Sequence, residues 1–263
     1  MSAAVCIDIS GLVCQSGHRT TLAIPRLQIL PGERVAIIGH NGAGKSTLLR
    51  VLTGFAPVRQ GQVRVLGRNV AQLNRRSMRV LRAEIGQVLQ GVHLVERLNV
   101  IDNTLIGCLS RVPGWRSWLR QFPPEEMFKA ETALRDVGML TKAAARADSL
   151  SGGERQKVAI ARMLLQSPSL ILADEPTAAL DPLAAVEICS LITAAARGAT
   201  LISVVHNPAL LPTLADRVIG LRQGRMLFDL AVDRVDSSQL TRLYQKDTYV
   251  ELGATFAAAE GVV

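Results

Sequence analysis

Aromatic residues and long apolar runs are both scarce in this sequence. Phe, Trp and Tyr make up 3% of the 263 residues, and no segment approaches the roughly 18 uninterrupted apolar residues of a membrane-spanning helix. The opening residues also lack the basic stretch, apolar run and small-residue cleavage site of a secretory signal. We therefore expect a chain that does not cross a membrane and that stays in the cytoplasm.

Cysteine is infrequent and lacks a metal-binding spacing. The four cysteines, Cys6, Cys14, Cys108 and Cys189, form no CxxC pair and have no histidine cluster near them. This pattern argues against a zinc site and against a disulfide framework. Reduced, ordinary thiols are the expected state.

Acidic residues are missing from residues 50–82, which hold eight arginines, and the whole chain has a formal net charge of +8. Such a segment suits nucleic acid, anionic lipid head groups or an acidic protein, and the simpler interpretation is a solvated arginine-rich face. The few aromatic residues and the missing zinc motif disfavour nucleic acid. We therefore expect no nucleic-acid partner.

Short apolar runs alternate with helical patterns along much of the chain. The apolar runs are residues 35–38, 170–173 and 200–205, and the helical patterns are residues 46–52 and 184–197. This alternation is typical of a mostly parallel sheet covered by helices. Residues 63–66 and 218–228 instead have the pattern of antiparallel strands and hairpins, which predicts an added β layer.

A helical region interrupts this pattern. Strand signals are missing between about residues 91 and 161. We therefore predict a single domain over 1–263. Its parts are a catalytic core with a β subdomain (1–90 and 162–250), an inserted helical subdomain (91–161) and a flexible tail (251–263).

The segment GHNGAGKST fits the phosphate-binding pattern GxxxxGK[ST] and lies between an apolar run and a helical pattern. Glycines permit positive φ and leave backbone N–H groups open to a phosphate chain. Lys45 supplies charge to the β- and γ-phosphates, and Ser46 offers a hydroxyl to Mg²⁺. The predicted nucleotide-binding residues are Gly39, His40, Asn41, Gly42, Ala43, Gly44, Lys45, Ser46 and Thr47.

Two acids follow the apolar run of LILADEP. Asp174 and Glu175 are adjacent, so their side chains point in different directions at the end of a buried strand. Asp174 is suited to the Mg²⁺ shell, while Glu175 is suited to polarising an attacking water. This division of roles predicts a hydrolase.

A second motif, LSGGERQ, precedes another helical pattern. Ser151 is an N-cap residue, and Gly152 and Gly153 expose the backbone of the first helical turn, so this helix start is also suited to phosphate. One nucleotide needs only one phosphate-binding helix start from the chain that holds it, and the phosphate-binding loop already supplies one. The economical arrangement is a two-fold dimer in which each chain lends this motif to the other's nucleotide.

These motifs together resemble the ATP-binding subunit of an ABC transporter, and they occur in family order over nearly the whole chain. AALD, residues 178–181, follows LILADEP; Gln90 closes IGQVLQ and matches the family's Q-loop glutamine; His206 closes TLISVVH and matches its switch histidine. The resemblance implies the ABC ATPase form of the α/β P-loop NTPase fold, with ATP and Mg²⁺ as ligands.

The resemblance also implies roles for individual residues in a closed homodimer. Ser151, Gly152 and Gly153 of one chain cap the γ-phosphate held by the other chain, and Asp181 links the two sites. Within one chain, Glu175 is the implied general base, and His206 fixes the γ-phosphate and the water. Gln90 contacts the metal and reports to the membrane partner.

Four segments are most similar to the ATPase subunits of phosphonate importers: residues 94–118, 137–139, 216–225 and 240–245. They imply an ATPase subunit that powers import of phosphonate or a related small oxyanion from the cytoplasmic face of the inner membrane. Transmembrane permease subunits and, indirectly, an extracytoplasmic solute-binding protein are the implied partners. The alternative is the nucleotide-binding subunit of a soluble complex related to phosphonate degradation.

Two features remain open at this stage. The family's adenine-stacking aromatic has no counterpart in CQSGHRTT, residues 14–21. Trp115 and Trp118 either contact the permease or pack the helical subdomain.

Overall fold

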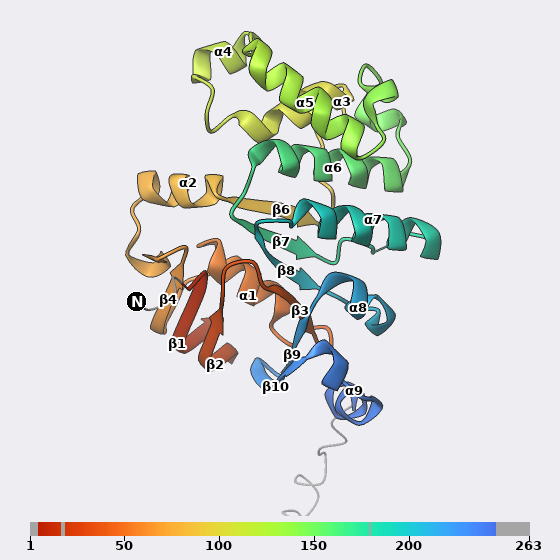
Figure 1. Cartoon of the computed structure of the whole chain (residues 1–263). Coiled ribbons are helices and arrows are strands. Elements are labelled where there is room, and N and C mark those ends of the chain that lie inside the picture. Colours follow the sequence, from red (N-terminus) through yellow and green to blue (C-terminus); the bar gives the residue numbers. More distant parts are fainter. Residues whose placement is uncertain (1–4, 17–18, 179, 246–263) are drawn as a thin grey trace, which may run out of the picture.

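The computed structural model describes residues 5–16, 19–178 and 180–245, so the predicted tail over 251–263 lies outside the described residues. One sheet runs through this part of the chain, and its ten strands have the order β5-β4-β1-β2-β10-β9-β3-β8-β7-β6 (Figure 1). Helices cover both faces of the sheet. The predicted α/β class is confirmed.

The parallel part of the sheet positions the motifs. Its strands are β3 (Arg34–Ile38), β6 (Ile85–Leu89), β7 (Leu170–Asp174), β8 (Thr200–Val204) and β9 (Arg217–Arg222). Each pairs in parallel with its neighbour in the order β9-β3-β8-β7-β6. Nearly every residue of β3, β7 and β8 is buried, as expected for strands covered on both faces.

The antiparallel part lies beside it. Its strands are β1 (Ile7–Ser16), β2 (Arg19–Ile29), β4 (Gln60–Val65), β5 (Arg68–Asn69) and β10 (Arg225–Ala231). The β9–β10 hairpin turns at Gln223 and Gly224, both with positive φ, as a two-residue turn of this hand requires. A parallel pairing of Arg225 with Ala23 joins this hairpin to β2 and makes the sheet continuous.

Helices divide between the two faces of the sheet. Their bounds are α1 (Lys45–Leu52), α2 (Arg75–Ala83), α3 (Val100–Leu105), α4 (Gly114–Trp118), α5 (Pro124–Asp136), α6 (Gly152–Gln166), α7 (Pro182–Ala195), α8 (Leu211–Leu214) and α9 (Ser237–Tyr244). Buried residues of α1 and α2 belong to one large core with β1, β2 and β4. Most of those of α5 to α9 belong to the core on the other face, while Ala130 of α5 and Leu165 of α6 belong to a third, small core.

Helices α3 to α6 form the upper part of the molecule in Figure 1, above the sheet edge made by β6 and β7. Within the described residues, no named strand lies between β6 and β7. Helix α6 continues as one element through the predicted boundary between residues 161 and 162. Among the same residues, none of the helices is both long and apolar enough to span a bilayer.

Candidate active site

The segment between β3 and α1 forms a loop whose glycines have separate structural reasons. A Cβ on Gly39 would lie 2.1 Å from the Leu221 carbonyl oxygen, so close backbone packing requires glycine there. Gly42 and Gly44 have φ of +80° and +102°, values that favour glycine. The loop therefore presents its backbone without side chains at these positions.

Lys45 places a positive charge at the centre of this loop. The residue is 5% exposed, and Nζ donates to the carbonyl oxygens of Gly39 at 2.7 Å and His40 at 3.0 Å. Burial lowers the pKa of Lys45, while the negative charges of Glu175 and Asp174 oppose that shift. Among the described residues no ion pair involves Lys45, so the charge is available to an anion.

Asp174 ends β7 beside the loop. Its Oδ1 atom is buried and has no hydrogen-bond partner within the described part of the chain. Burial, and then the charge of Glu175, raise the pKa of Asp174, while Ser46 and the charges of Lys45 and Arg50 act in the opposite direction. Oxygen donors of this kind are the ligands that Mg²⁺ prefers, so Asp174 and the Ser46 hydroxyl fit that ion.

Glu175 has a backbone φ of +51°, which is rare for a residue with a side chain. This geometry places Glu175 against His206, with Oε1 and Nε2 2.6 Å apart. Sequence reasoning assigned separate roles to the two residues and gave no signal of their direct contact. The contact joins the ends of two neighbouring strands, β7 and β8.

A cavity of about 1090 Å³ collects most of the predicted residues. The predicted residues that line it are Asn41, Gly42, Gly44, Lys45, Ser46, Thr47, Gln90, Glu175 and His206. Thr20, Thr21 and Gln223 also line it, and sequence reasoning missed all three. The β9–β10 turn reaches the loop because the Gly224 N–H donates to the Ala43 carbonyl at 3.0 Å. No short motif signals that contact.

The LSGGERQ segment lies elsewhere, at the start of α6. Ser151 accepts from the Glu154 backbone N–H at 3.3 Å, and Glu154 accepts from the Ser151 N–H at 2.9 Å, which together form a capping box. Asp181 caps α7 by accepting from the backbone of Leu183 and Ala184. Ser151, Gly152, Gly153 and Asp181 do not line the cavity of their own chain.

Comparison with known proteins agrees with this arrangement. The family model described as ABC transporter matches residues 22–178. The chain belongs to the ABC transporter family.

Two relatives within this family illustrate the similarity. A Pseudomonas syringae protein named "Phosphonates import ATP-binding protein PhnC 2" is 42% identical over 256 residues, which cover 95% of this chain and 92% of that protein. A Nitratidesulfovibrio vulgaris protein named "Phosphonates import ATP-binding protein PhnC" is 42% identical over 218 residues, 82% of each chain.

Solved structures of ABC cassettes share the fold. CbiO1 from Clostridium perfringens, part of the ABC transporter complex CbiONQ, has a TM-score of 0.79 at 26% identity, covering 91% of this chain and 94% of that one. The ATP-binding cassette MJ0796, in a dimeric post-hydrolysis state bound to ADP and Pi, has a TM-score of 0.75 at 27% identity, covering 86% and 98%.

One contact at the edge of the site was not predicted for this ABC cassette. The predicted loop residue His40 does not line the main cavity, and its Nε2 donates to the Tyr244 carbonyl at 2.7 Å because that oxygen can only accept. The two rings also meet edge to face, 5.1 Å between centroids. The end of α9 thus packs directly on the phosphate-binding loop.

Proposed function

We propose that this chain is the ATP-hydrolysing subunit of an importer for phosphonate or a related small oxyanion. The observation that carries the ATPase is the shared cavity of Lys45, Ser46, Glu175, Gln90 and His206. The proposed substrate class rests on the names of the relatives. They are named as phosphonates import ATP-binding proteins, and the similarity extends over most of their length. Transport of the solute itself belongs to membrane partners.

The phosphate-binding loop and Lys45 bind the triphosphate. Open backbone N–H groups and the start of α1 favour an anion. The buried ammonium, whose hydrogen bonds within the described residues go to the neutral carbonyls of Gly39 and His40, adds a fixed charge. Ser46, Asp174 and Gln90 would hold Mg²⁺, which neutralises phosphate charge when bound. The buried, unpartnered Oδ1 of Asp174 supports that assignment.

Glu175 acts as the general base in this proposal. Its carboxylate takes a proton from water as the water oxygen attacks the γ-phosphorus and the bond to the ADP oxygen breaks. Nε2 of His206 faces the Glu175 carboxylate, and an N–H at this position can donate to a γ-phosphate oxygen when ATP is bound. In the structure, Glu175 and His206 are each other's partner, 2.6 Å apart.

A second copy completes the proposed site. The exposed start of α6, with Ser151, Gly152 and Gly153, lies outside its own cavity, so a partner's nucleotide is the economical use for it, and Asp181 links the two sites. The dimeric MJ0796 cassette shares the fold. We also propose permease partners at the cytoplasmic face of the inner membrane and an indirect solute-binding partner. The proposed subdomains are the catalytic core with the β subdomain, residues 1–90 with 162–250, and the helical subdomain, residues 91–161.

The Glu175→Gln variant tests the mechanism. Loss of the base is expected to slow ATP hydrolysis by on the order of 10² to 10⁴ while ATP binding is kept, and the closed dimer accumulates. Turnover equal to the parent protein rejects the role of Glu175. The import role is tested in proteoliposomes that contain the permease and the solute-binding protein, where phosphonate should stimulate ATP turnover. Isolation only with soluble phosphonate-degrading enzymes would reject import.

A further inference from the structure

Helix α4 exposes both tryptophans of the chain. Trp115 is 58% exposed, Trp118 is 84% exposed and the following Leu119 is 52% exposed. No residue of α4 is buried. The two tryptophans therefore do not pack the helical region, and this ABC cassette presents an apolar surface that its own fold leaves open.

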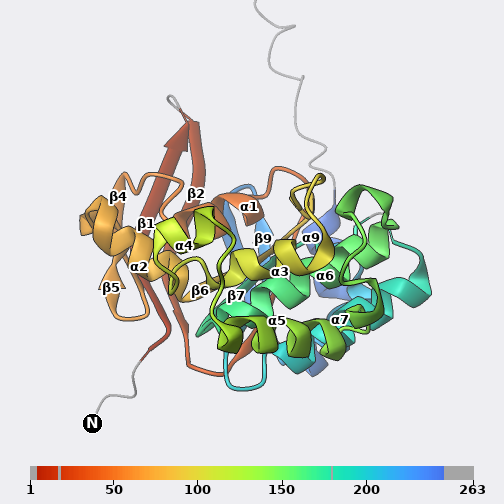
Figure 2. The same cartoon turned by 90° about the horizontal axis from the view of Figure 1, so that it is seen from above.

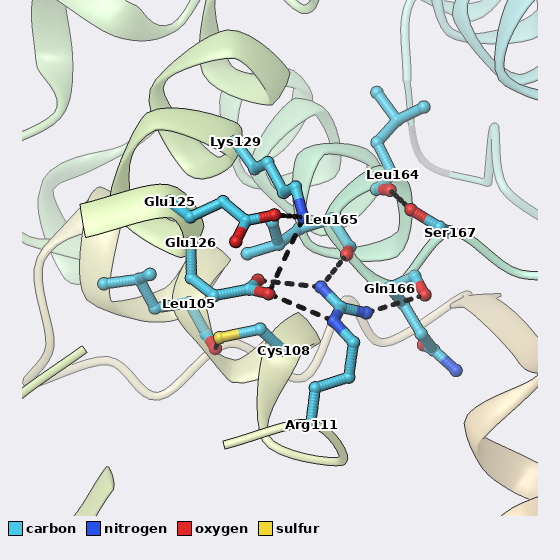
Figure 3. A network of polar contacts seen from close by, with 10 residues as sticks. All are labelled: Leu105, Cys108, Arg111, Glu125, Glu126, Lys129, Leu164, Leu165, Gln166 and Ser167. Carbon is cyan, nitrogen blue, oxygen red and sulfur yellow. Dashed lines mark hydrogen bonds and ion pairs between the residues drawn. The ribbon is translucent and has the colours of Figure 1, made fainter. Parts of the chain in front are cut away.

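The base of this exposed segment is firmly held (Figure 3). Arg111 donates to both carboxylate oxygens of Glu126, at 3.2 and 2.8 Å, and to the carbonyl oxygens of Leu165 and Gln166 at the end of α6. Val112 is buried in a small core with Leu105, Cys108, Ala130 and Leu165, against which Phe122 packs from the other end. The tryptophans thus project from a fixed support.

Arg120 adds a further tie because its guanidinium pairs with Asp102 of α3. Val112 and Phe122 anchor the two ends of the segment 112–122 in the small core. The middle of this segment, which contains α4, therefore faces outward. Exposure of large apolar side chains on a supported tip is unusual for a surface that contacts only water.

The surroundings of α4 are basic. Residues 109–124 contain three arginines and no acidic residue, and although Arg111 and Arg120 pair with Glu126 and Asp102, no ion pair among the described residues involves Arg116. Arg116 lies over the ring of Trp115, with its Cζ 5.2 Å from the ring centroid. Tryptophan and arginine together are typical of surfaces at the boundary between water and lipid, where the ring enters the head-group layer and the guanidinium meets phosphate.

Helix α2 extends this positive charge. Arg75, Arg76 and Arg79 are exposed, and no ion pair among the described residues involves them. In Figures 1 and 2, α2 and α4 both lie toward the left side of the molecule. A flat anionic surface can therefore approach both helices from one direction.

We propose that α4 and α2 form a direct contact with anionic phospholipid. Trp115, Trp118 and Leu119 enter the head-group region, and the arginines of α2 and α4 pair with lipid phosphates. The inference rests on the proposed function, which places the chain at a membrane. It adds a contact with the lipid itself, separate from docking on the permease.

Intrinsic fluorescence tests the contact directly because the chain has two tryptophans and both belong to α4. The purified protein is titrated with vesicles made of equal parts phosphatidylglycerol and phosphatidylcholine, and with vesicles of phosphatidylcholine alone. The emission is expected to shift to shorter wavelength with the anionic vesicles only. The shift should weaken as salt rises from about 0.05 M to about 0.5 M, because screening reduces charge attraction.

Variants separate the parts of the contact. Trp115→Phe and Trp118→Phe leave one reporter each, and both should still shift. Co-sedimentation with the anionic vesicles should fall on the order of fivefold for each α2 arginine changed to Gln. It should be largely lost in the Trp115→Ala, Trp118→Ala double variant. Leu30→Ala, which removes a half-exposed apolar side chain elsewhere, is the matched control and should bind vesicles normally.

Several outcomes would overturn the proposal. They are an unchanged emission spectrum with anionic vesicles, equal binding to both vesicle types, or a shift only when the permease is present in a phosphatidylcholine bilayer, which would assign the surface to a protein partner. ATP turnover is measured on the same samples. Turnover without vesicle binding rejects the lipid contact and leaves the ATPase standing, and vesicle binding without turnover does the reverse.

Discussion

Replacing Arg111 with alanine is expected to destabilise the protein by about 2–3 kcal/mol at neutral pH. The side chain joins α5 to the end of α6, since it bonds Glu126 and two helix-terminal carbonyls. Breaking a fully buried ion pair costs about 3–5 kcal/mol because one charge stays buried without its partner. The Glu126 side chain is 10% exposed but Arg111 is 36% exposed, so solvent screening reduces that figure.

The pH dependence of the loss identifies its cause. The hydrogen bond from Arg111 holds the pKa of Glu126 below its ordinary value, with burial acting against it. A carboxylate with a lowered folded-state pKa contributes stability that is present above its unfolded pKa and is lost as pH falls through the folded pKa. The difference between parent and variant should therefore be greatest near neutral pH and shrink in acid.

Urea unfolding of both proteins, followed by far-UV circular dichroism across pH, measures this difference as a change in midpoint at constant slope. Arg135→Ala is the control because Arg135 is an exposed arginine of α5, and its effect should stay within about 0.5 kcal/mol. A loss below about 0.5 kcal/mol for Arg111→Ala, or a loss that does not change with pH, would refute the assigned role of the ion pair.

Two further variants probe the phosphate-binding loop. Gly39→Ala should cost about 1–3 kcal/mol and weaken ATP binding, since its Cβ meets the Leu221 backbone; unchanged ATP affinity by calorimetry would contradict this. His40→Ala should cost about 1 kcal/mol and speed amide hydrogen exchange in α9, because the bond to Tyr244 is lost; identical exchange rates would show that the contact does not hold α9 in place.

Local pattern was sufficient for the phosphate-binding loop and its flanks. Residues 35–38 and 46–52 were predicted as strand and helix, and the structure has β3 at Arg34–Ile38 and α1 at Lys45–Leu52. Helix α7 begins at Pro182, two residues before the predicted start at 184, because Asp181 caps it and proline suits the first turn. These features depend on residues close together in the chain.

Contacts between segments far apart in the chain could not be predicted from local sequence patterns. His40 meets Tyr244 across 204 positions, and nothing in either short segment encodes that pairing. The sequence placed Glu175 and His206 in one site but not in contact, because their distance depends on a positive φ at Glu175 that its neighbours do not reveal. The exposure of Trp115 and Trp118 likewise depends on what the rest of the fold leaves uncovered.

Helix α6 connects the LSGGERQ motif at its start with the support of α4 at its end. Its 15 residues form one continuous helix about 22 Å long, from the capping box at Ser151 to the carbonyl groups that accept hydrogen bonds from Arg111. Gln166 at the far end also donates to three carbonyls, those of Arg82, Ala83 and Ile85, and so attaches α6 to the end of α2. A tilt of α6 imposed at its Ser151 end must therefore move α4, with its tryptophans, and α2, with its arginines, together.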